Sequence, residues 1–264
     1  MQEHNEIEQT WDSYSDEHFG KLDYAEIFKE IGKDPYRGFP KAVAELLAEY
    51  LPDLRGKKVC VPSCGDGVAA FAFCEMGAEV FAADISCGQI ENARKRAEGK
   101  NYNIKFLHSD SMSLNELNND FFDLVYTSNG VHVWIRDLTA MYKNFSRILK
   151  KGGIYIMFDT HPWSRPFDKG SLEEGKFVIR KPYEETGPFL DDVTYDWRIQ
   201  DYVNALVSSG FSILRMEEFH SIPEDLPNHN YLSDNYDEPD KYDWHKNPCA
   251  ALPQCLGCVC RKPG

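Results

Sequence analysis

Apolar residues along this chain form short continuous runs that alternate with stretches of helical spacing. In one such stretch Phe39, Val43 and Leu46 fall on a single helical face. The runs predict strands at 59–61, 79–83, 104–107, 122–126 and 154–158. The spaced stretches predict helices at 39–50, 68–76, 88–98 and 137–150. Strands separated by single helices predict βαβ units, and therefore a parallel sheet with helices on both faces.

This alternation stops after the fifth predicted strand. Residues 159–197 are rich in proline, glycine, aromatic and charged residues, which favours an insertion that rises from the sheet as a lid. Within it, 177–180 and 193–197 are expected to pair as a small hairpin. The remainder predicts a helix at 198–209, a strand at 211–219, an acidic proline-containing loop at 222–253 and a last strand at 255–261.

The whole chain is expected to form a single domain of α/β class. Its parts are an N-terminal arm (1–38), a core (39–158), the lid insertion (159–197) and a C-terminal helix with strands (198–264). The expected fold is a Rossmann-like, seven-stranded, mostly parallel sheet with an antiparallel C-terminal strand. Isolated aromatic residues in the acidic arm fit two arrangements: a helix packed on the core, or a cap that closes over a ligand pocket.

Charge and cysteine content narrow the cellular setting. The net charge of −14 disfavours nucleic acid and an anionic membrane as partners, because both would be repelled. No apolar run approaches the roughly 20 residues that span a bilayer, and the polar, acidic start does not resemble a signal peptide. The scattered cysteines indicate reduced thiols in a cytoplasmic protein.

Polar residues collect where the predicted strands end. These positions are Ser63–Gly67, Asp84–Ser86, Asp110 with Ser111, Ser128–Gly130 and Asp159–His161. Because the carboxyl ends of parallel strands meet at one edge, the edge predicts a ligand site. Gly65 and Gly67 would let a ligand approach the backbone, and Asp84 would accept from ribose hydroxyls. The spacing Gly65-x-Gly67-x-x-Ala70 also fits a dinucleotide fingerprint, so an NAD-dependent oxidoreductase is an alternative.

Residues 40–262 resemble a class I S-adenosylmethionine-dependent methyltransferase. The resemblance is to the small-molecule (methyltransferase-11/25-like) branch, in which an HP dipeptide, here His161-Pro162, follows the fifth strand. The first motif reads VPSCGDG over 61–67, with Val61 where an acid is common and Ser63 in place of the first glycine. The resemblance implies a transferase of class EC 2.1.1.-, with S-adenosyl-L-methionine as cofactor and S-adenosyl-L-homocysteine as product.

The resemblance also implies which residues bind the cofactor. Asp84 matches the ribose-binding acid, Asp110 the acid that accepts from the adenine amino group, and Asn129–Val131 the segment beside the methionine. The full set of expected cofactor residues is Ser63, Cys64, Gly65, Gly67, Asp84, Ile85, Ser86, Asp110, Ser111, Met112, Asn129, Gly130 and Val131.

Methyl transfer from a sulfonium requires an acceptor held in line in a dry pocket, and a base if the acceptor carries a proton. His161 and His132 lie just after predicted strands and are the candidate bases. Tyr14 and Tyr24 from the arm, Trp134, and Tyr195 and Trp197 from the lid are candidate contacts for a small-molecule acceptor. Because Val61 and Ser63 depart from the motif, a non-catalytic protein that binds the same cofactor is an alternative.

A metal site is not expected. Cys249, Cys255, Cys258 and Cys260 gather near the C-terminus, but the last two alternate along one face of a predicted strand. Neighbours on one strand face are poorly placed for a tetrahedral site, so these cysteines are interpreted as buried thiols.

Overall fold

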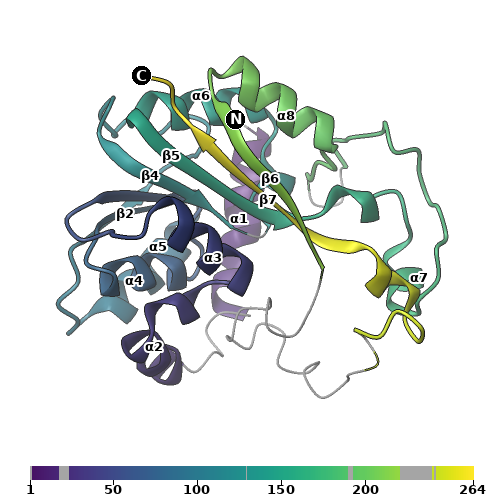
Figure 1. The fold of residues 1–264 in the computed structure, drawn as a ribbon, viewed down its shortest axis with the longest axis horizontal. Helices are drawn as coiled ribbons and strands as arrows, with labels where there is room; N and C mark the ends of the chain where they lie inside the picture. Colours follow the sequence, from purple (N-terminus) through teal and green to yellow (C-terminus); the bar gives the residue numbers. More distant parts are fainter. Residues whose placement is uncertain (1, 18–23, 129, 190–192, 221–239, 241) are drawn as a thin grey trace.

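The computed structural model describes residues 2–17, 24–128, 130–189, 193–220, 240 and 242–264. Its strands are β1 (Lys58–Pro62), β2 (Glu79–Asp84), β3 (Ile104–His108), β4 (Phe122–Thr127), β5 (Leu149–Thr160), β6 (Ser212–His220) and β7 (Pro253–Arg261). They form one sheet in the order β3-β2-β1-β4-β5-β7-β6 (Figure 1). Strands β1 to β5 pair in parallel, and β7 is antiparallel to both β5 and β6. The predicted fold class, with its antiparallel C-terminal strand, is confirmed.

Helices flank this sheet. They are α1 (Gln2–Glu17), α2 (Tyr24–Lys33), α3 (Lys41–Tyr50), α4 (Val68–Glu75), α5 (Cys87–Ala97), α6 (Leu138–Ile148), α7 (Lys169–Glu173) and α8 (Ile199–Ser208). Short 3-10 turns are η2 (Pro35–Gly38), η3 (His132–Trp134), η4 (Pro162–Ser164) and η8 (Pro248–Ala251). None of the helices in the described ranges is long and apolar enough to cross a membrane.

Two apolar clusters cover the two faces of the sheet. Helices α3 and α4 pack with Val59 and Val61 of β1, whereas Cys60, between them, joins the cluster under α6 and α8. Successive strand residues point to opposite faces, so a strand that is apolar throughout must be covered on both sides. Helix α4 is apolar all round, and its Phe71 and Phe73 are fully buried, as a central helix requires.

The lid insertion folds differently from the predicted hairpin. Ile179 forms an antiparallel bridge with Phe167, and Phe189 forms one with Thr194, so 177–180 does not pair with 193–197. The chain reverses after α7 at Gly175, which has a φ of 70°, and returns along the segment that follows β5. The hairpin prediction was wrong because α7 and its glycine turn supply a nearer partner.

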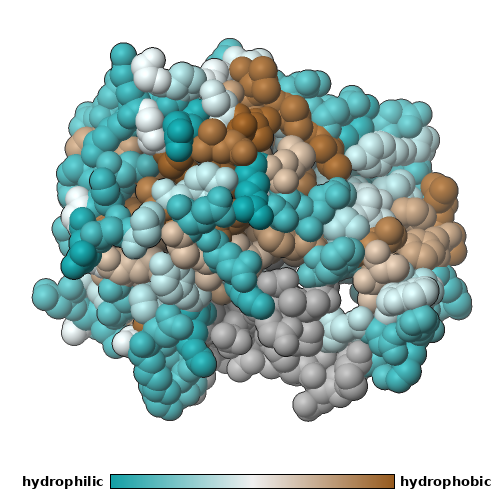
Figure 2. Space-filling model, viewed as in Figure 1, coloured by the Kyte–Doolittle hydropathy of each residue, from teal (hydrophilic) through white to brown (hydrophobic). Residues whose placement is uncertain are grey.

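The lid also carries an apolar surface. Phe177, Val178 and Ile179 are exposed consecutively, and Ile179 is the most open at 70%. Figure 2 shows apolar colour on the right of the view, on the side where Figure 1 places α7 and the lid, and a larger apolar area at the top centre, where Figure 1 places α8 and β6.

The arm forms two helices that reach different parts of the core. Helix α2 buries Ile27 and Ile31 beside α4, and the more polar α1 lies against α5 (Figure 1). Of the predicted acidic loop at 222–253, only 240 and 242–253 lie in the described part of the chain.

Candidate cofactor and acceptor site

The turn between β1 and α4 is left-handed at three positions. Ser63, Gly65 and Gly67 have φ values of 55°, 53° and 87°. Serine is therefore present where glycine is favoured, which costs about 1–2 kcal/mol. The Ser63 hydroxyl compensates with a 2.8 Å hydrogen bond to the hydroxyl of Ser111, which follows β3. Ser63 therefore preserves the left-handed turn of the glycine motif, and its hydroxyl links the turn to the loop after β3.

Asp84, at the end of β2, is buried beneath this turn. Its carboxylate accepts from the Gly65 amide at 2.8 Å and from the Ser86 amide at 2.9 Å, one bond to each oxygen. Burial raises its pKa to about 6, against the lowering effect of those backbone hydrogen bonds. A carboxylate offers about four acceptor positions, and the Ile85 amide is a further backbone donor that lowers the pKa of Asp84, so the carboxylate keeps acceptor capacity for a donor such as a ribose hydroxyl.

Gln89 is a candidate site residue that the sequence interpretation missed. It lies in the first turn of α5, at the same sheet edge as Asp84, and it is fully buried. Neither its amide nitrogen nor its amide oxygen has a partner among the described residues. An unpaired buried amide costs free energy, so Gln89 fits a ligand that offers both a donor and an acceptor. The sequence does contain a signal for Gln89, because it is a polar residue next to Ile90 on the buried face of an otherwise charged helix.

The carboxyl edge of the sheet also has open space beside two glycines, where a bound ligand could lie. A Cβ placed on Gly65 or Gly130 would meet no atom of another residue within 4 Å, whereas one on Gly67 would meet Phe71 at 2.9 Å. Gly65 follows β1 and Gly130 follows β4, and these strands are neighbours. The open backbone, Asp84 and the orphaned Gln89 amide together fit an adenosine-containing cofactor.

The loop after β3 completes the nucleoside side. An Asp110 carboxylate oxygen accepts from the Met112 amide at 2.8 Å, which turns the chain over 110–112. Ser86 caps α5 by accepting from the Gln89 amide, and its hydroxyl donates to Asp12 of α1 at 2.5 Å. The arm therefore lies directly beside the residues expected to hold the ribose.

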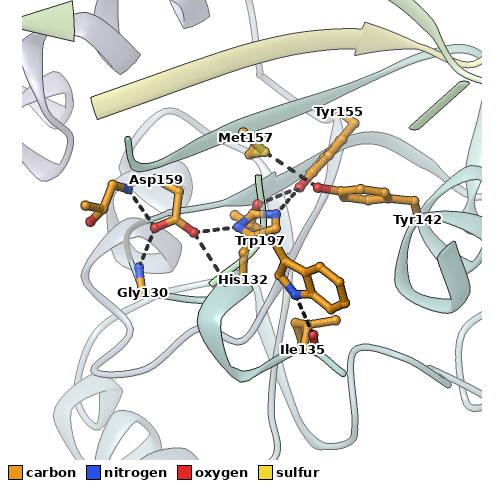
Figure 3. Close-up of polar contacts among 10 residues, drawn as sticks. Gly130, His132, Ile135, Tyr142, Tyr155, Met157, Asp159 and Trp197 are labelled. Atoms are coloured by element: carbon orange, nitrogen blue, oxygen red, sulfur yellow. Dashed lines mark hydrogen bonds and ion pairs between the residues drawn. The ribbon is translucent and has the colours of Figure 1, made fainter. Parts of the chain in front are cut away.

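The ends of β4 and β5 are joined by a buried polar network (Figure 3). The Asp159 carboxylate, 1% exposed, accepts from His132 Nδ1 at 2.5 Å and from the amides of Gly130, His132 and Thr160 at 2.7–3.2 Å. Burial alone would raise the pKa of Asp159, but the His132 hydrogen bond and charge, with the amide donors, lower it. Tyr155 hydroxyl lies 3.4 Å from His132 Nε2 and 2.8 Å from the Thr127 hydroxyl.

Both candidate bases are thus engaged in this structure. His132 is fully buried, with partners at each ring nitrogen. His161 accepts from the Trp163 amide at Nδ1 and donates from Nε2 to Glu218 of β6 at 2.8 Å. The two pairs differ in access, because the Glu218 side chain is 56% exposed while that of Asp159 is buried.

Most of the aromatic candidates converge on η3. The Trp134 ring meets that of Trp11 at 5.5 Å, and Trp11 meets Tyr14 at 5.8 Å. From the lid, Tyr195 and Trp197 stack at 5.4 Å with an interplanar angle of 5°. Both residues are bonded to the backbone of η3 or of the residue that follows it. The Tyr195 amide donates to the Val133 carbonyl, and the Trp197 indole N–H donates to the Ile135 carbonyl.

Tyr24 does not join them. Its hydroxyl donates to Asp66 at 3.3 Å, and Arg96 covers its ring at 3.9 Å. Asn129, the remaining candidate, lies outside the described residues.

The terminal cysteines do not form a ligand cluster. Cys258 and Cys260 are buried in β7 with sulfur atoms 3.5 Å apart, and the Cys249 thiol donates to the Leu172 carbonyl. Within the described ranges, no three His, Cys, Asp or Glu side chains come together as a metal site.

Comparison with known proteins agrees with this geometry. Residues 60–153 match the family model described as a methyltransferase domain. The chain is 27% identical over 186 residues to the sterol 24-C-methyltransferase erg6 of Aspergillus fumigatus, covering 69% of this chain and 46% of that protein. It is 32% identical over 124 residues to a demethylmenaquinone methyltransferase of Clavibacter sepedonicus, covering 46% of each. The chain therefore spans less than half the length of these relatives.

A solved structure shares the fold. An S-adenosylmethionine-dependent methyltransferase from Mesorhizobium loti superposes with a TM-score of 0.61 at 23% identity, covering 83% of this chain and 96% of the other. The chain has the fold of the class I S-adenosylmethionine-dependent methyltransferases, and its residues 60–153 match a methyltransferase domain, as the sequence motifs predicted. The methyltransferase domain match supports S-adenosylmethionine over the dinucleotide, the two cofactors that the glycine turn left open.

Proposed function

We propose that this protein transfers the methyl group of S-adenosylmethionine directly to a small apolar acceptor. Two polar groups at the sheet edge carry the proposal: the Asp84 carboxylate, which can accept from a further donor, and the Gln89 amide, which has no partner among the described residues. Asp84 would accept from the ribose hydroxyls, and Gln89 would pair with the same nucleoside. Asp110 is proposed to accept from the adenine amino group.

The cofactor supplies an electrophilic sulfonium methyl, so the protein's own task is to hold and enclose the acceptor. The aromatic side chains around η3 are proposed to form that enclosure, with Trp134 as its wall and Tyr14, Tyr195 and Trp197 around it. Their rings favour an apolar or planar acceptor. The names of two relatives, a sterol and a demethylmenaquinone methyltransferase, support an acceptor of this kind.

If the acceptor carries a proton, His161 is the better-placed base. Its partner Glu218 is largely exposed and can swing into solvent, which would free Nε2. His132 would have to break a buried pair with Asp159, and breaking such a pair costs about 3–5 kcal/mol.

Isothermal titration with S-adenosylmethionine and S-adenosylhomocysteine tests the proposal. Micromolar binding that is lost in Asp84→Asn supports it, and no binding at millimolar cofactor overturns it. A panel of sterols, quinols and other apolar acceptors with radiolabelled methyl donor then tests transfer.

A second function is favoured by Val61, which replaces an acid, and by the engagement of both histidines. It is non-catalytic binding of the same cofactor. Tight binding with no transfer across the panel would support this function over catalysis.

A further inference from the structure

The segment 130–135 joins three parts of the molecule. Gly130 and His132 bond to Asp159 at the end of β5 (Figure 3). The Val133 and Ile135 carbonyls hold the lid, as described above. We propose that the buried His132–Asp159 pair is a positioning device, which sets the 130–135 segment against the methionine half of the cofactor. This inference rests on the proposed function.

The sheet order places the methionine half near this segment. Asp84 ends β2 and Asp110 follows β3, so the nucleoside lies over that side of the edge. In the order β3-β2-β1-β4-β5, neighbouring strands are roughly 4.8 Å apart and β3 lies at the edge of the sheet. The rest of the cofactor would therefore extend away from that edge, across β1 toward β4. Gly65 and Gly130, whose backbones face open space, lie along that path.

Asp159 acts on the segment and does not itself serve as a ligand. Its carboxylate receives four donors, two on each oxygen: the Gly130 and Thr160 amides on one, and the amide and ring of His132 on the other. About four acceptor positions exist on a carboxylate, so none is left for the cofactor's ammonium group. The bonds instead fix which way the Gly130 and His132 amides point.

A packing role alone would not require this chemistry. Burying a charge pair carries a desolvation cost that apolar residues of similar volume avoid, so the pair is a poor choice for filling space. The pair instead fixes the orientation of the groups bonded to it, because hydrogen bonds have preferred angles that apolar contacts lack. The Tyr155 hydroxyl also contacts the outer ring nitrogen of His132, and Thr127 in turn bonds to that hydroxyl.

The same segment carries the acceptor side. Trp134 contacts Trp11 of the arm, and the Val133 and Ile135 carbonyls hold the lid. A shift of the segment would therefore move the acceptor wall and the backbone beside the methionine together. The pair thereby couples the placement of the donor to the placement of the arm and lid side chains that contact this segment.

The test compares two probes by calorimetry. S-Adenosylhomocysteine contains the amino-acid chain, whereas 5′-methylthioadenosine has the same nucleoside and a thioether but lacks that chain. In Asp159→Asn, an amide nitrogen replaces one carboxylate oxygen and cannot accept the hydrogen bonds donated to that oxygen. The affinity for S-adenosylhomocysteine is therefore expected to fall 10- to 100-fold. Affinity for 5′-methylthioadenosine is expected to stay within twofold of the wild type.

Further variants keep the outcome clear. His132→Asn and the milder Tyr155→Phe should show the same selective loss, the latter about threefold, so the test survives if Asp159→Asn fails to fold. Tyr142→Phe removes a buried hydroxyl that bonds to Met157 in the same core, and it should alter neither affinity. Equal losses for both probes, or no loss for either, would overturn the inference. Failure of the wild type to bind either probe would instead contradict the proposed function.

Discussion

A substitution at Gly65 is expected to affect cofactor binding more strongly than folding. Its φ of 53° means that an added methyl group costs backbone strain, but among the described residues it would meet no atom within 4 Å apart from its chain neighbours. Gly65→Ala should therefore fold with a loss of about 1–2 kcal/mol in unfolding free energy. It should weaken S-adenosylhomocysteine binding at least tenfold, because the methyl occupies the proposed ligand path.

Gly56→Ala is the matched control, since Gly56 has a φ of 68°, equally open surroundings and a place in the turn before β1. Calorimetry and urea unfolding of both variants check the prediction. Similar unfolding losses with equal affinities would show that Gly65 does not face the cofactor.

Asp84 makes a pH prediction with a defined sign. Its pKa is about 6 when folded and roughly 3.9 when unfolded, so the protonated form is favoured by folding. Its contribution to stability is present below pH 4 and is lost as the pH rises through 6, a change of about 3 kcal/mol. Asp84→Asn should remove this component, as seen in the difference between the two urea-unfolding profiles from pH 4 to 8.

Cofactor binding should follow the opposite course. Ribose hydroxyls donate to the ionised carboxylate, so affinity for S-adenosylhomocysteine should fall up to tenfold per unit below pH 6 and level off above it. Titrations at stepped pH check this, and an affinity that stays flat from pH 5 to 7 would argue against Asp84 as the ribose ligand.

The residues of the site were predictable to different extents. Asp84 could be found because a motif spacing and a strand end coincide on it. Gln89 could not, since its importance lies in having no hydrogen-bond partner, which only a folded environment defines. The engagement of His132 also depends on β5 lying beside β4, a contact between distant parts of the chain.

Among the elements, α1 is held by polar contacts that are easily tested. Asp12 accepts from the Ser86 hydroxyl and from the Gly88 amide, and Ser15 accepts from Asn92. Asp12→Ala should cost about 1 kcal/mol and speed release of S-adenosylhomocysteine about fivefold, because the arm closes beside the nucleoside.

Stopped-flow tryptophan fluorescence measures that release rate. Gln9→Ala, an exposed change on the same helix, serves as control and should leave the rate unchanged. An unaltered rate in Asp12→Ala would mean that α1 packs on α5 without gating the site.

The elements themselves were predicted well where pattern and packing coincide. The βαβ core was confirmed because strands buried on both faces and amphipathic helices follow strict periods. The lid hairpin was wrong because its pairing depends on α7 and Gly175, whose turn no periodicity reveals. The position of α1 could not be derived, since its short apolar stripe of Ile7, Trp11 and Tyr14 does not indicate which part of the core it contacts.

At the scale of the whole molecule, thiol accessibility reports on the fold. Cys87 is exposed, whereas Cys60, Cys258 and Cys260 are fully buried, and burial raises the pKa of the Cys60 thiol. A maleimide should label Cys87 rapidly and the buried thiols at least about 1000-fold more slowly, because their reaction requires unfolding. Mass spectrometry over time, with Cys87→Ser as control, checks the order. Rapid labelling of Cys258 in native buffer would contradict the central placement of β7.

The position of β7 between β5 and β6 has a consequence for synthesis on the ribosome. Residues 253–261 leave the exit tunnel after both of their neighbouring strands. Until β7 arrives, β5 presents an unpaired apolar edge and β6 has no partner within the sheet. Until residues 253–261 emerge, the nascent chain must therefore keep these unpaired strand edges from pairing with other polypeptides, and chaperones that shield exposed strands would favour its folding.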